Sequence, residues 1–250
     1  MTQWLFDLGN SRLKCTQLDG EGRPGEVIAF GHDERGFAEA LRRHLPAAAD
    51  SACLASVASP VLTLAVIDVL TERFQRISLA RTQAAFAGVR VAYARPEKLG
   101  VDRFLAMVAA HARGARAWMI AGIGTAITID LLDARGLHRG GRIAPSPALM
   151  RAALHQAAAQ LPAQGGIYRE FADDTEDALA SGCDGAALGL IERSLRLAAR
   201  ELGETPALLL HGGGAEALRA CLPEAEFAPS LVLEGLAQWA KAGRPADAAA

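Results

Sequence analysis

The sequence has few aromatic residues, no strong excess of either charge and no long apolar run. Aromatic residues make up 5% of the 250 residues, and the formal net charge is −2. Basic side chains are scattered and are not interleaved with aromatic ones, so neither nucleic acid nor another polyanion is an expected partner. No apolar run approaches the roughly 18–20 residues of a membrane span, so we expect no membrane association.

Cysteine is also scarce, with four residues far apart and no CxxC pair. Four cysteines would allow paired disulfides, but a chain of this length can bury a sizeable core without them. We therefore expect reduced, buried thiols. The N-terminus lacks a basic region followed by an apolar run, so no secretory signal is expected. These features predict a cytoplasmic protein.

Two common nucleotide-binding motifs are missing, and two glycine turns are present instead. Neither GxGxxG nor GxxxxGK[ST] occurs, which argues against Rossmann and P-loop folds. The segments Trp4–Lys14 and Ile120–Asp130 each read as a strand, a glycine turn and a second strand. Glycine lets backbone amides approach a phosphate, threonine hydroxyls donate to its oxygens, and carboxylates can hold Mg²⁺ through water. The pair predicts a cleft that closes on a nucleotide from two sides.

The rest of the chain divides into two similar halves, each of which begins with such a hairpin. Hydrophobic periodicity predicts helices over 34–45, 60–74, 101–113, 147–161 and 230–241, and strands over 52–57, 89–93, 117–121, 126–132, 137–143 and 207–210. A further helical region runs from Thr175 to Leu202, and Gly182 and Gly185 are expected to interrupt it. The halves resemble one unit repeated with divergence.

Five segments in a fixed order identify a resemblance. FDLGNSRLK, LGVDRFLAM, GTAITID, GGRIAPSPALMRAAL and TEDALASG are similar to motifs of type III pantothenate kinases, which belong to the acetate and sugar kinase/Hsp70/actin superfamily. The similarity spans Trp4 to about Gly214. It implies an α/β fold with two ribonuclease-H-like (actin-like ATPase) domains, whose mixed sheets are flanked by helices. We expect the domains to cover residues 1–115 and 116–250.

The resemblance also implies a reaction, the ATP-dependent phosphorylation of pantothenate to 4'-phosphopantothenate, which is the first step of coenzyme A biosynthesis. The members of this family are homodimers that use Mg²⁺ and a monovalent cation, K⁺ or NH₄⁺. One departure concerns that cation. The family usually has Asp two residues before the GTA glycine, and this chain has Gly122 there. The cation is then absent, weaker, or held by carbonyls and water.

The phosphate site implied by the resemblance combines the two glycine turns. Asp7 would hold Mg²⁺ through a water molecule, and Lys14 would stabilise charge on the transferring phosphoryl group. Taken alone, Asp7 is equally a turn residue and Lys14 a solvated strand residue. The implied ATP- and phosphate-binding residues are Asp7, Leu8, Gly9, Asn10, Ser11, Arg12, Leu13, Lys14, Gly124 and Thr125.

The implied substrate site centres on Asp102, near the start of a helix whose dipole favours an ionised carboxylate. Asp102 would act as the catalytic base, and Arg103 would pair with the pantothenate carboxylate. Their alternatives are an ordinary first-turn aspartate and a surface salt bridge. Thr175 is equally a helix N-cap. The implied substrate-binding residues are Tyr93, Gly100, Val101, Asp102, Arg103 and Thr175.

Other readings stay open. A nucleotide-binding regulatory protein of the same fold, without turnover, is the main alternative, and a kinase for another small anionic alcohol is a third. Asp130 shares a strand face with Thr128 and either faces the cleft or ends the strand. The His211–Gly214 turn resembles the superfamily's glycine turn near adenosine, and the other histidines show no metal-ligand spacing.

Overall fold

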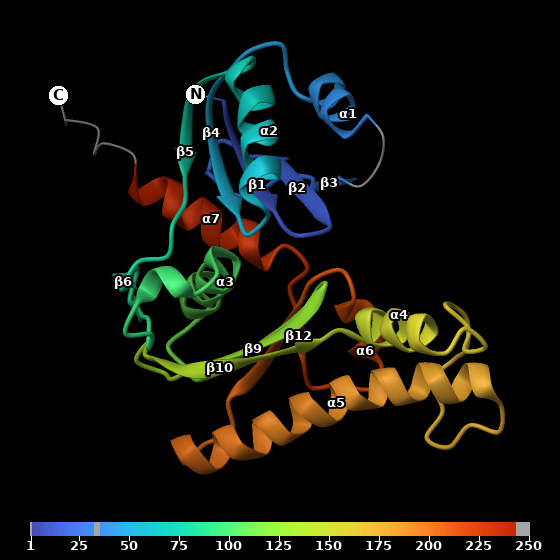
Figure 1. Ribbon diagram of the computed structural model, residues 1–250. Helices are drawn as coiled ribbons and strands as arrows, with labels where there is room; N and C mark the ends of the chain where they lie inside the picture. Colours follow the sequence, from blue (N-terminus) through green and yellow to red (C-terminus); the bar gives the residue numbers. More distant parts are fainter. Residues whose placement is uncertain (1, 33–35, 244–250) are drawn as a thin grey trace. The chain divides into compact units, whose positions relative to one another are not determined.

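The computed structural model describes residues 2–32 and 36–243, and these form two compact units. The first unit contains residues 2–113 together with 230–243, and the second contains residues 114–229. Each unit is an α/β body built on one five-stranded sheet. Figure 1 shows both sheets with their flanking helices.

The sheet of the first unit has the order β3-β2-β1-β4-β5. Strands β1 and β2 form the expected antiparallel hairpin, whereas β4 runs parallel to β1 and β5 runs parallel to β4. Since parallel strands need a crossover, a helix follows β4 before β5 begins. The strands are β1 (Gln3–Leu8), β2 (Arg12–Gln17), β3 (Ile28–Gly31), β4 (Ala49–Ser56) and β5 (Phe74–Leu79).

Helices α1 (Phe37–His44) and α2 (Pro60–Thr71) share one apolar core with this sheet. Alternate residues of β1 supply that core, among them Phe6 and Leu8, which are fully buried. Because side chains alternate along a strand, Leu5 and Asp7 point to the other face. Helices α3 (Val101–Ala112) and α7 (Leu231–Ala242) contact β4 and β1, and short elements β6 (Ala85–Phe86), β7 (Val89–Arg90) and η1 (Pro96–Lys98) precede α3.

Helix α7 corrects the expected domain boundaries. The sequence predicted a second domain over 116–250, but α7 packs on α3 and belongs to the first unit. Gly235 explains the close packing, because a Cβ at this position would lie only 2.0 Å from the Leu105 carbonyl oxygen. The backbones of the two helices therefore touch where α7 has no side chain.

The second unit repeats the arrangement of the first. Its sheet has the order β10-β9-β8-β11-β12, with β8 and β9 as the hairpin and β11 parallel to β8. The match of strand order and direction confirms the predicted repeat of one unit and the predicted fold class. The strands are β8 (Trp118–Ile123), β9 (Ala126–Leu132), β10 (His138–Pro145), β11 (Ala207–His211) and β12 (Glu226–Phe227).

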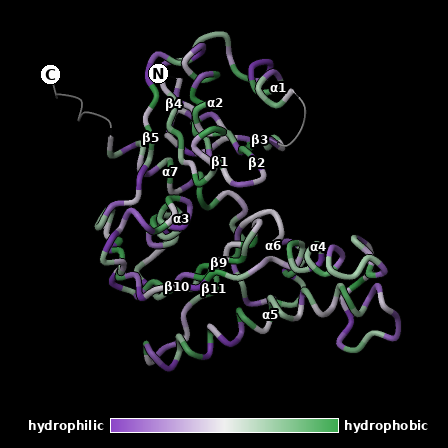
Figure 2. The backbone as a smooth tube through the Cα atoms, viewed as in Figure 1, coloured by the Kyte–Doolittle hydropathy of each residue, from purple (hydrophilic) through white to green (hydrophobic). Residues whose placement is uncertain are grey.

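The long helix α5 (Thr175–Leu202) covers one face of this second sheet. Its buried stripe includes Ala187, Leu188 and Ile191, which share a core with apolar residues of β8 and β9. The alternating colours along α5 in Figure 2 reflect this two-sided pattern. Helices α4 (Pro147–Ala157) and α6 (Ala215–Arg219) complete the unit.

Several local expectations were wrong. Helix α5 is continuous through Gly182 and Gly185, because packing of its apolar stripe outweighs a cost of about 1 kcal/mol for each glycine. Helix α4 ends at Ala157, before residue 161, and β3 and β5 were not predicted. The strand expected over 89–93 is reduced to β7, which pairs with β6. The helix expected over 34–45 is observed from Phe37, and residues 33–35 lie outside the described residues.

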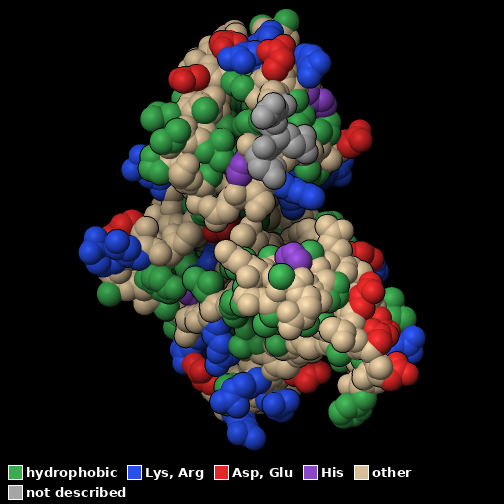
Figure 3. Space-filling view, turned by 45° about the vertical axis from the view of Figure 1, so that its right-hand side comes forward, with side chains coloured by type: hydrophobic (Ala, Val, Ile, Leu, Met, Phe, Trp, Pro, Cys, Tyr) green, Lys and Arg blue, Asp and Glu red, His purple; other side chains and the backbone are tan. Residues whose placement is uncertain are grey.

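No helix among the described residues is long and apolar enough to cross a membrane. Side chains of both charges occur on the face of the molecule that Figure 3 shows. The cysteines at positions 15, 53 and 183 are buried, and Cys221 is exposed.

Candidate active site

The first glycine turn is a tight connection between β1 and β2. The amide of Gly9 donates to the carbonyl of Arg12 (3.0 Å), which leaves Asn10 and Ser11 exposed at the tip. The imidazole Nε2 of His32 lies 3.1 Å from the Gly9 carbonyl oxygen and braces the turn. Sequence reasoning gave His32 no role, because a brace formed across 23 residues leaves no local pattern.

Leu8 and Leu13, which were predicted to bind phosphate at this turn, can offer only backbone groups to a ligand. The side chains of Leu8 and Leu13 are fully buried in the core shared with α1 and α2. Arg12 is exposed, and Lys14 is half-buried. The candidate phosphate groups of the turn are therefore its amides, the polar side chains at its tip, and the lysine.

Asp7 and Lys14 occupy one rung of the hairpin. They are register partners on β1 and β2, on the sheet face opposite the α1/α2 core. Burial raises the pKa of Asp7 from 3.8 to about 7, the charge of Lys14 lowers it, and the charge of Asp102 raises it. Asp7, Lys14 and Asp102 therefore lie within electrostatic reach of one another.

Asp102 stands in the first turn of α3, directly after Gly100 and Val101. Its Oδ1 accepts a hydrogen bond from the amide of Arg103 at 2.8 Å, so the carboxylate folds back over the N-terminus of the helix. A Cβ at Gly100 would lie 2.5 Å from the same Oδ1. Glycine at position 100 thus makes room for the carboxylate, while Val101 is buried in the core.

Arg103 is 7% exposed, which is unusual for arginine, and the expected alternative of a surface salt bridge is wrong. Its Nη1 donates to the hydroxyl of Tyr93 at 3.3 Å. The structure thus brings together two residues, ten positions apart, that the resemblance assigned to the substrate. The guanidinium offers the planar donor pair that a carboxylate ligand requires.

The second glycine turn lies between β8 and β9 in the second unit. The amide of Gly124 donates to the carbonyl of Ala126 (3.0 Å), and Gly124 and Thr125 are exposed. This turn matches the first in its place in the repeated topology. It therefore presents solvent-exposed backbone and an exposed threonine side chain at the corresponding point of the second sheet.

Asp130 lies inside the second sheet and does not end its strand. It is 2% exposed, and its Oδ1 lies 3.0 Å from Nε2 of His138, which is 1% exposed. The pair joins β9 to β10 next to a register shift between His138 and Gly140. Its partner and burial indicate a structural role for Asp130.

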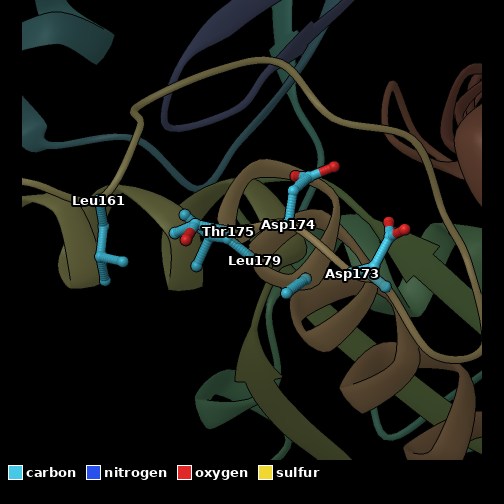
Figure 4. Close-up of a pocket in the computed structure, with 7 residues that line it drawn as sticks. Leu161, Asp173, Asp174, Thr175 and Leu179 are labelled. Carbon is cyan, nitrogen blue, oxygen red and sulfur yellow. The ribbon is translucent and has the colours of Figure 1, made fainter.

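Thr175 is the first residue of α5 but does not cap it. Asp174 is the N-cap, and its side chain accepts from the amide of Asp177 at 2.9 Å. Thr175 lines a surface pocket with Leu161, Asp174 and Leu179, as Figure 4 shows. Neither Gly124 nor Thr125 lines this pocket.

No group of three or more His, Cys, Asp or Glu side chains with metal-binding geometry occurs among residues 2–32 and 36–243. The donor set around Asp7 nevertheless suits Mg²⁺. It consists of hard carboxylate oxygens, and Mg²⁺ usually keeps several waters and binds through one or two carboxylates and substrate phosphates. A divalent cation would also relieve the burial cost that raises the pKa of Asp7.

Comparison with solved structures gives the class of the fold. The chain is similar to a Campylobacter jejuni protein assigned to the Baf family of transcriptional activators, with a TM-score of 0.65, 19% identity, and coverage of 96% of this chain and 98% of that one. It is also similar to the archaeal actin homologue Ta0583, with a TM-score of 0.54, 10% identity, and coverage of 97% and 100%. The protein has the fold of actin-like ATPases and sugar kinases.

Sequence comparison narrows this class. The model of the type III pantothenate kinase family matches residues 4–197. A type III pantothenate kinase of Stenotrophomonas maltophilia (strain R551-3) is 58% identical over 96% of this chain and 98% of its own length. One from Xanthomonas campestris pv. campestris (strain B100) is 55% identical with the same coverage. The chain belongs to the type III pantothenate kinase family.

Proposed function

We propose that this protein transfers the γ-phosphoryl group of ATP to the primary hydroxyl of pantothenate, which forms 4'-phosphopantothenate for coenzyme A biosynthesis. Membership of the family carries the choice of substrate. The observation that supports the chemistry is the grouping of Asp7, Lys14 and Asp102 in the first unit. Two carboxylates and a lysine form the set that phosphoryl transfer from a metal-bound nucleotide requires.

Asp102 is the proposed catalytic base. It orients the attacking hydroxyl and accepts its proton as the bond to the γ-phosphorus forms and the bond to the β-phosphate oxygen breaks. The hydrogen bond from the Arg103 amide and the start of α3 both favour the ionised carboxylate. An ionised Asp102 can accept the proton of the attacking hydroxyl.

Lys14 and the first glycine turn are the proposed charge-stabilising groups. Lys14 stabilises negative charge on the transferring phosphoryl group, and the amides near Gly9 donate to phosphate oxygens. Asp7 would hold Mg²⁺ through water, and the ion would neutralise charge on the phosphates. The residues at the second turn, Gly124 and Thr125, are proposed to bind ATP phosphates as well.

Arg103 and Tyr93 are the proposed anchors for pantothenate. Burial of Arg103 against the Tyr93 hydroxyl holds the guanidinium in one orientation, so it loses little conformational entropy when it binds a carboxylate. Gly100 and Val101 shape the adjoining turn, and Thr175 is proposed as a further contact. Arginine at this place favours an acidic substrate over a neutral sugar.

We also propose that the protein is a homodimer that works in the cytoplasm, where ATP is available. Support for the dimer comes from apolar side chains on the second unit. Helix α4 buries none of its residues, and Ile143, Leu149 and Leu154 are exposed by 67%, 43% and 43%. A monomer rarely leaves such a group in water, and a second copy would cover it.

The test is ADP release in the presence of ATP, Mg²⁺ and pantothenate. We expect release that depends on pantothenate, and a loss of about 10²–10⁴-fold in kcat for Asp102→Asn, because the amide cannot accept the proton. Asp68→Asn, an exposed helical aspartate on α2, is the matched control and should keep full turnover. Equal rates for Asp102→Asn and the native chain would refute the base assignment.

The alternative, a non-catalytic regulatory protein, predicts no pantothenate-dependent ADP release. Such a protein would bind ATP without turning it over when pantothenate is added. Nothing in that alternative requires Asp7, Lys14 and Asp102 to be grouped, so the kinase is the better supported reading.

A further inference from the structure

Three residues on neighbouring strands form one rung across the second sheet, directly before the second glycine turn. His211 on β11 is in register with Gly122 on β8, and Gly122 is in register with Thr128 on β9. Their side chains lie on the face opposite the one that packs on α5, since the adjacent Ala121 and Ile123 belong to that core. His211 and Thr128 therefore flank a glycine.

The space above Gly122 is already filled. A Cβ at this position would lie 2.7 Å from Nε2 and 2.9 Å from Cε1 of His211, and 2.8 Å from Oγ1 of Thr128. Contacts this short do not occur between real atoms of these kinds. Any side chain at position 122 would therefore require the imidazole of His211 and the hydroxyl of Thr128 to rotate away, and glycine is the residue that fits the present arrangement.

Backbone carbonyls beside the rung are engaged too. The Ile123 carbonyl accepts the amide of Gly214 at 2.9 Å, and the Ala126 carbonyl accepts the amide of Gly124 at 3.0 Å. A Cβ at Gly212 would lie 2.4 Å from the same Ile123 oxygen, so the turn after His211 closes tightly over it. These contacts hold the His211–Gly214 turn against the start of the second glycine turn.

The resemblance implied a monovalent cation at this point, held by an acidic residue at position 122. The residues present do not fit such an ion. Alkali cations take oxygen ligands, whereas an imidazole nitrogen suits transition metals. Position 122 has no side chain that could coordinate an ion, and a Cβ there would meet the imidazole of His211 and the hydroxyl of Thr128.

We propose that this chain has lost the monovalent-cation site, that the His211 ring fills its place above Gly122, and that turnover does not depend on K⁺ or NH₄⁺. The inference rests on the proposed kinase function. It makes His211 a positioning residue for the second glycine turn, which it supports in place of a bound ion.

The first test measures pantothenate-dependent ADP release in potassium chloride and in tetramethylammonium chloride at equal ionic strength. For the native chain we expect the two values of kcat/KM to agree within about twofold. For the double variant Gly122→Asp/His211→Ala, which provides a carboxylate and removes the imidazole, so that only a rotation of the Thr128 hydroxyl is still needed, we expect K⁺ to raise kcat/KM by about tenfold or more. Stimulation of the native chain by about tenfold would overturn the inference.

Gly189→Asp is the matched control, because it adds the same charge to the second unit at an open position on α5. It should respond to K⁺ as the native chain does. A double variant that folds, by circular dichroism, and shows no response to K⁺ would contradict the assignment of Gly122 and His211 as the residues that exclude the ion.

A second readout does not depend on turnover. Thallous ion is a probe for potassium sites, and its NMR line broadens when it binds to a protein. The experiment is done with Mg²⁺ and a non-hydrolysable ATP analogue present. For the native chain we expect no saturable broadening that added K⁺ reverses. For the double variant we expect saturable broadening. Saturable binding by the native chain would overturn the inference. Absence of ADP release in every salt would instead refute the kinase proposal. The thallous-ion binding experiment would then still decide whether the cation site has been lost.

Discussion

At the scale of single residues, the first unit concentrates its unusual electrostatics on Asp7. A strand aspartate in water has an ordinary pKa of 3.8, and burial raises the value here to about 7. Lys14, across the rung, limits that rise, and Asp102 adds to it. Burial thus disfavours the ionised form of Asp7, and a bound cation would stabilise that form. This is the behaviour expected of a metal-binding residue.

The raised pKa predicts how stability depends on pH. Between pH 3.8 and about 7, the folded state holds a proton on Asp7 that the unfolded state releases, so this group lowers the free energy of unfolding as pH rises. Asp7→Asn removes the effect. Relative to the native chain without nucleotide, we expect the variant to gain stability on going from about pH 5 to about pH 8.

Urea unfolding of both proteins at the two pH values measures this difference. Asp68→Asn, at an exposed position on α2, serves as the control and should show no such gain. A stability difference between Asp7→Asn and the native chain that stays constant with pH would contradict the assigned pKa.

At the scale of single residues, sequence patterns located the site better than they explained it. The turn at Gly9 and the first-turn position of Asp102 follow from local patterns, and both were predicted. The brace from His32, the burial of Arg103 and the ring of His211 above Gly122 depend on contacts between distant segments. No local pattern encodes those contacts, so they could not be predicted.

At the scale of secondary structure, the contact between α3 and α7 ties the proposed catalytic helix to the end of the chain. Almost every residue of α3 from Val101 to Ala110 is buried, as expected for a helix covered on all sides. Gly235 on α7 allows the two backbones to meet at Leu105. The position of Asp102 therefore depends on a helix that begins more than a hundred residues later.

This contact predicts a large effect from a small substitution. In Gly235→Ala the new methyl group would overlap the backbone carbonyl of Leu105. Neither group can move by a side-chain rotation, so helix α7 must shift. We expect a loss of about 2–4 kcal/mol in the free energy of unfolding, measured with urea. Gly189→Ala on α5, where the space is open, should instead be neutral or stabilising by up to about 1 kcal/mol. Equal stability of Gly235→Ala and the native chain would refute the packing argument.

The same contact shows why the domain boundaries could not be read from the sequence. The amphipathic pattern of residues 230–241 gave the helix, but it does not say which sheet or helix covers its apolar face. Continuity along the chain suggested the second domain, and burial against α3 placed α7 in the first unit. The predicted interruption of α5 at Gly182 and Gly185 was wrong for a related reason, because tertiary packing outweighs local helix propensity.

At the scale of the whole molecule, the two units share one strand order, and this repeat was visible in the sequence as two glycine hairpins. The edge strands β3 and β5 were missed because few of their residues are buried, which leaves a weak pattern. The fold class needed only the hairpins and the order of the motifs. The residues of each site needed the family resemblance as well.

The exposed apolar group on the second unit predicts the oligomeric state. If Leu149 and Leu154 on α4 lie in the dimer interface, replacing both by Asp places two charges in an apolar contact, so we expect a monomer. Sedimentation equilibrium measures the outcome. Val61→Asp, at an apolar position on α2 that is 80% exposed, is the control and should leave the dimer intact. A native chain that sediments as a monomer would refute the proposed dimer.

The most direct test of the central claim identifies the product. The protein is incubated with ATP, Mg²⁺ and pantothenate, and the product is examined by phosphorus NMR. The account predicts a new phosphate monoester resonance, coupled to the protons of the primary alcohol carbon of pantothenate, that is absent for Asp102→Asn. ATP that remains intact, or is hydrolysed to free phosphate without a pantothenate ester, would contradict it.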